Sequence, residues 1–218
     1  MTRIGTILTI QTGRVQTQPK GDGGTYRTAL HKETVQGPLR ATTLGFTGDE
    51  QADRRYHGGP DKALCCFPIE HFAEIGAHVG AQLPHGAFGE NCTLEGMLEC
   101  DVCLGDRLRF GGAVVEVSQP RQPCVNLARR WGSADIVKWM VERGFTGWYV
   151  RVLEECDVAA PCAVELLARP NPSWTVGRLN GVMTAKRAEA GDLREAVNIA
   201  ALSEAWRATF LKRLEGRE

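Results

Sequence analysis

The residues best suited to chemistry gather in segment 119–124, which reads Gln-Pro-Arg-Gln-Pro-Cys. An apolar, β-branched run over 113–118 precedes it and predicts a buried strand. Because two prolines cannot continue a sheet ladder, we expect the chain to leave the sheet here along a stiff path that presents Arg121 and Cys124. Segment 125–131 has a helical pattern, so Cys124 would lie near a helix N-terminus, where amides and Arg121 favour thiolate over thiol. Such a thiolate is a nucleophile or a soft metal ligand, and the competing interpretation is a buried, inert cysteine.

Four segments in a fixed order resemble one protein family. The Gln-Pro-Arg-x-Pro-Cys segment resembles the signature of MOSC domains, which are named after the C-terminal domain of molybdenum-cofactor sulfurase. Upstream, in the family's order, stand His57-Gly58-Gly59-Pro60-Asp61-Lys62-Ala63, then Phe88-Gly89-Glu90-Asn91, then Gly105-Asp106. The resemblance covers nearly the whole chain and is greatest to the YiiM-like MOSC proteins of bacteria, which also carry a small C-terminal domain of three helices.

The resemblance implies a molybdenum cofactor (molybdopterin) with Cys124 as the protein ligand of the metal, since molybdenum in a pterin dithiolene accepts a soft thiolate. The pterin carries a phosphate, whose burial demands cations and backbone amides. Lys62, Arg121 and the backbone of Gly58 and Gly59 are the candidates for holding it. Some family members have arginine where Lys62 stands, and lysine keeps the charge but lacks the bidentate fork. The resemblance also carries a family-level association with pyridoxal phosphate.

Three further residues are candidates for catalytic work at this site. His57, Asp61 and Asn91 could position water or carry protons. The competing interpretation for His57 and Asp61 is a hydrogen bond that stabilises the loop. For Asp49 and Glu90 we expect ordinary turn or capping roles.

The activity implied by the resemblance is reduction of N-hydroxylated substrates, such as amidoximes and hydroxylaminopurine bases, as a detoxification. The metal would take the oxygen of an N–OH group and leave an amine, and two external electrons and protons would reset it. The sequence contains no recognisable flavin, haem or iron–sulfur module, so we expect a separate electron-donor protein. Phe88, Trp148 and Tyr149 could stack on a purine, but we expect core roles for them.

Two other classes of function stay open. One is a sulfur-transfer or cofactor-carrier protein in which Cys124 carries a persulfide. The other is a hydrolase with a hard metal such as Mg²⁺ bound by Asp49, Asp53, His57 and Asp61, which leaves the proline-framed cysteine unexplained. The spaced histidines His71, His78 and His85 predict a solvated face, because Gly80 and Pro84 interrupt any helix through all three.

The elements that must position these residues are mostly strands, and we expect a closed β-barrel with peripheral helices over residues 1–169. Ile4, Thr6, Leu8 and Ile10 alternate in a first strand, segment 19–24 is a loop or hairpin tip, and Gly111-Gly112 predicts a hairpin. A helix is expected to begin at 133–136 and end at Gly144, with closing strands over 148–153 and 163–167.

The two prolines at 170 and 172 predict a linker to a second domain over 173–218. Three helices are expected there, capped by Ser173, by Asp192 with Glu195, and by Ser203. So small a bundle must pack on the main domain or on a second subunit, which leaves a homodimer open. Because the chemical motifs lie between Asp49 and Cys124, we expect the bundle to be an appendage to the catalytic barrel. The alternative is that the helices close over the pocket or recruit the electron donor.

Composition limits the remaining classes. The net charge of the 218 residues is zero, which predicts no nucleic-acid partner and no anionic membrane surface. The N-terminal segment lacks a signal-peptide pattern and no apolar run approaches transmembrane length. Eight cysteines in such a chain predict reduced thiols and a cytoplasmic location.

Overall fold

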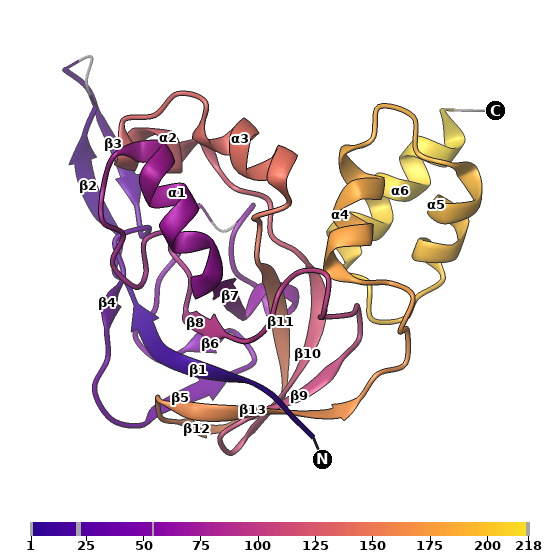
Figure 1. Cartoon of the computed structure of the whole chain (residues 1–218), viewed down its shortest axis with the longest axis horizontal. Coiled ribbons are helices and arrows are strands. Elements are labelled where there is room, and N and C mark those ends of the chain that lie inside the picture. Colours follow the sequence, from indigo (N-terminus) through magenta and orange to yellow (C-terminus); the bar gives the residue numbers. More distant parts are fainter. Residues whose placement is uncertain (1, 21–22, 54, 217–218) are drawn as a thin grey trace.

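A seven-stranded closed β-barrel forms the centre of the protein (Figure 1), as the strand pattern predicted. The computed structural model describes residues 2–20, 23–53 and 55–216. Pairing of the first and last strands closes the barrel, and only β7 and β8 among these strands pair in parallel. In pairing order, the strands are β13 (Cys162–Ala168), β9 (Arg107–Phe110), β10 (Ala113–Pro120), β11 (Trp148–Glu154), β7 (Leu64–Pro68), β8 (Cys92–Glu95) and β1 (Thr2–Thr12).

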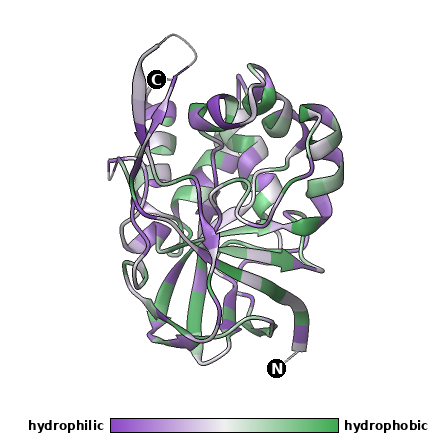
Figure 2. Ribbon diagram, turned by 90° about the vertical axis from the view of Figure 1, so that its left-hand side faces the viewer, coloured by the Kyte–Doolittle hydropathy of each residue, from purple (hydrophilic) through white to green (hydrophobic). Residues whose placement is uncertain are grey.

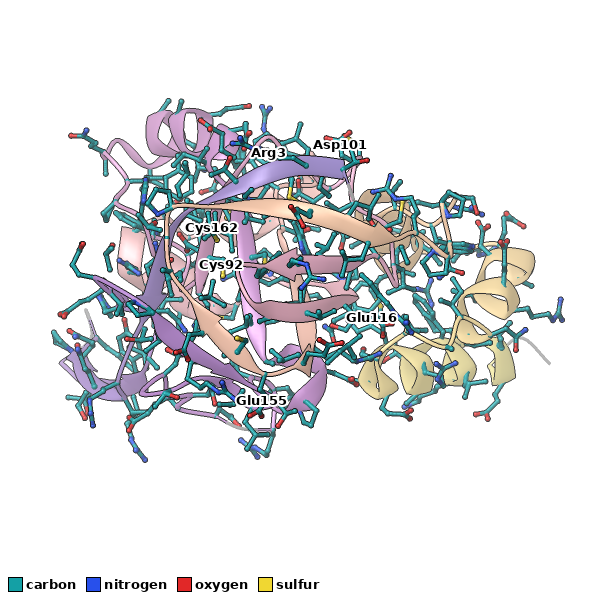
Figure 3. All side chains as sticks on the ribbon, turned by 90° about the horizontal axis from the view of Figure 1, so that it is seen from below. Arg3, Cys92, Asp101, Glu116, Glu155 and Cys162 are labelled. Atoms are coloured by element: carbon teal, nitrogen blue, oxygen red, sulfur yellow. The ribbon has the colours of Figure 1, made fainter. Side chains whose placement is uncertain are left out.

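The barrel is filled by its own side chains, as expected for so few strands. Val115, Val117, Val150 and Trp148 are all fully buried within the main hydrophobic core. Green and purple residues alternate along the barrel strands in Figure 2, which is the two-residue period of a sheet with one face on a core. Figure 3 looks at the barrel from below and shows Cys92 and Cys162 inside the ring of strands.

The first strand departs from simple alternation. The register between β1 and β8 shifts between Ile7 and Thr9, which marks a β-bulge. An extra residue reverses the parity of the side chains beyond it, so Ile7 and Ile10 both face the core. The prediction that Leu8 shares a face with Ile10 was therefore wrong.

Strand β10 runs further than predicted, to Pro120, which pairs with Trp148 of β11. Pro120 is the last residue of the strand, where the sheet can dispense with one amide donor. Arg121, the next residue, is still bonded to the segment just before β11, because its amide donates to the Gly147 carbonyl at 3.0 Å. The chain thus leaves the sheet two residues later than expected. The hairpin of β9 and β10 at Gly111-Gly112 is confirmed.

Short strands extend the barrel on one side. A hairpin of β2 (Gln16–Pro19) and β3 (Thr25–Thr28) projects from the barrel (Figure 1), and Gly21 and Asp22 of its predicted tip lie outside the described residues. A small sheet joins β12 (Cys156–Val158), β5 (Leu39–Thr42) and β6 (Gly45–Phe46), while β4 (Glu33–Thr34) pairs with β1.

Helices cover one end of the barrel and enclose a second core around Phe67, Phe88 and Met140. They are η1 (Pro60–Lys62), η2 (Ile69–His71), α1 (Phe72–Val79), α2 (Val125–Trp131) and α3 (Ile136–Arg143). The solvated face predicted for the histidines was wrong for His71. This side chain is buried, and its Nε2 lies 2.8 Å from Oε2 of Glu99.

The C-terminal segment forms three helices, as predicted: α4 (Val176–Thr184), α5 (Ala190–Val197) and α6 (Glu204–Glu215). The cap at Ser203 is confirmed, because its side chain accepts from the Trp206 amide. The other two caps were wrong. Thr175, not Ser173, caps α4, and α5 begins at Ala190, so that Asp192 lies inside it and pairs with Arg178.

These helices pack on the barrel domain. Leu104 of the barrel domain is buried in the core of the helical domain. The Ser203 amide donates to the Ser118 carbonyl at 3.1 Å, and Arg151 Nη2 donates to the Ala201 carbonyl at 3.0 Å. Within the described residues, none of the helices combines the length and the apolar character needed to cross a bilayer.

Candidate functional site

One large cavity, of about 910 Å³, brings together most of the residues singled out from the sequence. Its wall includes Cys124, Arg121, His57, Gly58, Lys62 and Asn91. Gly59 and Asp61 are absent from that wall. The segments 49–62, 88–91 and 119–129 meet beside strands β7 and β10, which both pair with β11. The Ser118 hydroxyl of β10 donates to the Asp61 carbonyl at 2.5 Å, and the Asn91 amide donates to the Cys65 carbonyl of β7 at 2.7 Å.

Cys124 occupies the position that the sequence predicted, at the N-cap of α2. Its backbone is extended, its side chain makes no capping hydrogen bond, and the residue is half-buried. The thiol is therefore available to the cavity rather than packed in the core. This arrangement contradicts the interpretation of Cys124 as an inert core cysteine.

Arg121 lies beside Cys124 and is buried. Its Nη2 donates to the Phe88 carbonyl at 2.6 Å, whereas Nη1 has no hydrogen-bond partner. An unpartnered guanidinium nitrogen in a buried position is costly unless a ligand or its counter-charge satisfies it. Arg121 thus supplies the cation that an anionic group in this cavity would need.

Cys65, which sequence reasoning did not select, and Tyr149, for which a core role was expected, share this part of the wall. Cys65, on β7, is a second thiol, and burial raises its pKa to about 12, so it stays protonated. Burial also raises the pKa of Tyr149, and Cys65 and Cys124 act in the same direction. Neither Cys65 nor Tyr149 carries charge at neutral pH. Of the two thiols in this wall, Cys124 is more accessible than Cys65.

His57 and Lys62 bring two titratable groups to the opposite part of the wall. Burial lowers the pKa of His57, and the nearby cations Arg121 and Lys62 lower it further, so its ring is neutral at pH 7. Burial also lowers the pKa of Lys62, although Asp61 opposes this. Lys62 Nζ donates to the Tyr56 carbonyl at 2.7 Å, which holds the ammonium at the cavity.

Asp61 points away from the cavity. Its Oδ1 accepts from Nε and Nη2 of Arg151 at 3.1 and 2.7 Å, and its Oδ2 accepts from the Glu204 amide at 3.1 Å. The residue therefore connects η1 to the start of α6. Asp61 therefore makes a structural contact and does not line the cavity, where its motif had suggested that it would lie.

Asn91 and Asp49 form a hydrogen-bonded network in the wall of the cavity. Asn91 Nδ2 donates to Asp49 Oδ2 at 2.9 Å, and Asn91 Oδ1 accepts from the Cys65 amide at 3.1 Å. Asp49 also pairs with Lys32 at 2.6 Å. Glu90 accepts from the amides of Gly86 and Phe88, which is the turn role expected of it.

The carboxylates do not converge on a hard-metal site. Asp49 pairs with Lys32, Asp53 with Arg55, and Asp61 with Arg151. Among the described residues, no three His, Cys, Asp or Glu side chains are grouped to hold a metal ion. Because each carboxylate already has its own cation, the geometry gives no support to the hydrolase interpretation.

The cavity is cationic although the whole chain is neutral. Its described wall contains six lysine and arginine side chains against three carboxylates, a balance of +3. The cations are Arg27, Lys32, Arg55, Lys62, Arg121 and Arg129, and the carboxylates are Asp49, Glu50 and Asp53. An accessible thiol next to this charge and to the unpartnered Arg121 Nη1 fits a soft metal that carries an anionic organic ligand.

No pattern in the sequence pointed to one part of the wall. Met183 of α4 and Ala205, Trp206 and Thr209 of α6 line the same cavity as Cys124. Contact between the C-terminal helices and the cavity is the arrangement that the sequence left open beside the appendage interpretation. Their contribution arises from docking between domains, which no local pattern encodes.

Comparison with known proteins agrees with this architecture. Residues 53–165 match the MOSC domain, and residues 174–217 match the YiiM-like, 3-alpha helix domain. The chain therefore belongs to the MOSC family, in the YiiM-like group that carries the three-helix domain.

Individual relatives cover nearly the full chain. Protein YflK of Bacillus subtilis is 39% identical over 95% of this chain and 93% of its own, and Protein YiiM of Escherichia coli is 35% identical over 94% and 90%. The crystal structure of YiiM from Geobacillus stearothermophilus superposes with a TM-score of 0.82 at 34% identity, covering 96% of this chain and 99% of that one. A Gibberella moniliformis protein named Reductase is 31% identical over 89% of this chain, which spans 35% of its length.

Proposed function

We propose that this protein is a molybdenum-cofactor-dependent reductase of N-hydroxylated compounds such as amidoximes and hydroxylaminopurine bases. The observation that carries the proposal is the accessible thiol of Cys124 beside the buried Arg121, whose Nη1 lacks a partner, in a cation-rich cavity. Membership of the MOSC family and the similarity to a protein named Reductase support it.

The chain's own residues have distinct tasks in this proposal. Cys124 would hold the metal through its thiolate, and Arg121 and Lys62 would hold the anionic part of the pterin. Gly58 lines the cavity with a φ of 79°, a backbone conformation that favours glycine. When bound, the cofactor supplies two electrons and an acceptor for the hydroxyl oxygen of the substrate.

Protons must accompany the electrons, because reduction of R–NHOH to R–NH₂ and water consumes two of each. His57 lines the cavity, and because its pKa is lowered by burial and by Arg121 and Lys62, a proton that its ring takes from solvent is readily passed on to the substrate. Asn91 fixes the neighbouring floor of the cavity through Asp49. A separate protein must donate the electrons. All eight cysteines are unpaired, which suits a reducing cytoplasm.

The test combines cofactor analysis with turnover. Purified protein should contain molybdenum, give a fluorescent pterin after acid oxidation, and reduce benzamidoxime or 6-hydroxylaminopurine with a chemical electron donor. Cys124→Ser should abolish turnover and lower the molybdenum content while the thermal unfolding curve stays unchanged, since the volume hardly changes. Wild-type turnover in the Ser variant would refute the assigned ligand. Cyanide-releasable sulfur on Cys124 without metal would instead indicate a sulfur-transfer protein.

A further inference from the structure

The wall of the cavity is divided by polarity between the two domains. Every cation and carboxylate in the described wall comes from the barrel domain. The helical domain contributes only Met183, Ala205, Trp206 and Thr209, none of which is ionisable. The cavity therefore has a cation-rich part near Arg121 and an uncharged part formed by α4 and α6.

The uncharged part is an accessible surface. Ala205 and Thr209 are exposed and lie one turn apart on α6, so they present one face of the helix to the cavity. Trp206 is nearly buried against Phe210, with ring centroids 5.8 Å apart, and offers only part of its indole. Met183 adds a polarisable thioether from α4, of a kind that packs well against aromatic rings.

This face is held in a fixed position relative to the cation-rich part of the cavity. Asp61 accepts from the Glu204 amide, the first of α6, and the next residue, Lys62, lines the cavity. Ser203 is tied to β10 through its amide and the Ser118 carbonyl. The distance between the two parts of the cavity is thus set by hydrogen bonds at the start of α6.

We propose that α4 and α6 form the specificity wall, against which the apolar, non-reacting body of the substrate packs. The substrates are then N-hydroxylated compounds with a flat hydrophobic body, such as a benzene or purine ring, because an uncharged wall with an indole edge and a thioether favours such surfaces. The identity of the reacting group rests on the proposed function, whereas the packing of the body does not.

Two substitutions on α6 test the wall. Ala205→Trp places a bulky side chain in the cavity, and Ala208→Trp makes the same change at an exposed position of the same helix that does not line it. Thr209→Phe is a second obstruction, in case Ala205→Trp perturbs folding. With benzamidoxime, Ala205→Trp should raise KM by about tenfold, while turnover of hydroxylamine, which has no apolar body, and the pterin content stay unchanged. Ala208→Trp should match the wild type in every assay.

Calorimetric titration with benzamide and adenine gives a readout that needs no turnover. Wild type and Ala208→Trp should bind at least one of these probes, and Ala205→Trp should bind it about tenfold more weakly. If the wild type reduces none of the N-hydroxylated substrates yet binds the probes with this order of affinities, the proposed reaction is wrong but the proposed specificity wall is supported. Absence of probe binding to the wild type, or equal affinity in Ala205→Trp and Thr209→Phe, would overturn the wall.

Discussion

At the level of single residues, the cavity depends on how its surroundings tune each group. Cys65 and Cys124 are both thiols in the same wall, yet burial keeps Cys65 protonated while Cys124 is accessible at the start of α2. Arg121 keeps its charge in a buried position, and that charge in turn disfavours a proton on His57. The reactive character of the site is therefore a property of placement, not of residue type alone.

His57 offers a direct test of anion binding. Its pKa lies below the ordinary value of about 6.5, so protonation costs the folded state more than the unfolded state. The contribution of His57 to stability should therefore fall as the pH drops below about 6.5. Sulfate bound near Arg121 and Lys62 would offset their charge and raise the pKa of His57.

The measurement is an NMR titration of the histidine rings with and without sulfate. His78 serves as the control, because it pairs with Asp135 on the outer surface, away from the cavity. A pKa of His57 that does not move, or that moves no more than the pKa of His78, would contradict anion binding in this part of the cavity.

At the level of elements, the short helix η1 connects two functions within three residues. Lys62 faces the cavity, whereas Asp61 faces Arg151 and the start of α6. The tight turn of a 3₁₀ helix sends neighbouring side chains in different directions, which allows one segment to serve both. This geometry explains why the motif contains both an acid and a base, although only the base lines the cavity.

Removal of the Asp61 carboxylate should loosen α6 at its first turn. Asp61→Ala leaves the Glu204 amide without an acceptor and Arg151 without one partner, and we expect a loss of about 1–2 kcal/mol after allowance for partial exposure. Hydrogen exchange at the Glu204 amide should become faster. Asp192→Ala breaks a pair with Arg178 of similar exposure inside the helical domain and should leave that amide unaffected. Equal exchange rates in the two variants would show that Asp61 does not hold α6.

At the level of the whole molecule, the barrel and the three helices act as one unit. Leu104 belongs to the barrel domain in sequence but to the helical core in space. The core of the helical domain is thus completed by the barrel domain, and the cavity of the barrel domain is completed by the helices. Neither part is self-sufficient, so we expect cooperative unfolding.

Leu104→Ala tests this unity. Truncation of a fully buried leucine should cost about 2–5 kcal/mol, and barrel and helices should still unfold in a single transition at a lower temperature. Tryptophan fluorescence and far-ultraviolet circular dichroism should report the same midpoint. Leu211→Ala, at an exposed position of α6, is the control and should change little. Two separate transitions, with only the helical one shifted, would contradict the cooperative description.

Local patterns in the sequence were sufficient for much of the fold and for one side of the site. Alternation and turn residues predicted the barrel strands, and the prolines around Arg121 predicted a stiff exit that ends at Cys124. His57 and Lys62 were found because their segment resembles a family motif. These features depend on neighbours in sequence, such as a fixed φ or a two-residue period, and are readable before folding.

The sequence by itself determined the family, the barrel and the place of Cys124 at the start of a helix, whereas its exposure to the cavity came from the structure. Only the tertiary structure decided that Asp61 turns to α6, that Cys65 shares the cavity, and that Ala205 and Trp206 form its far wall. The physical reason is that burial, pKa and side-chain direction depend on packing between segments far apart in the chain. The bulge in β1 shows the same limit, since one inserted residue reversed a face that alternation had predicted.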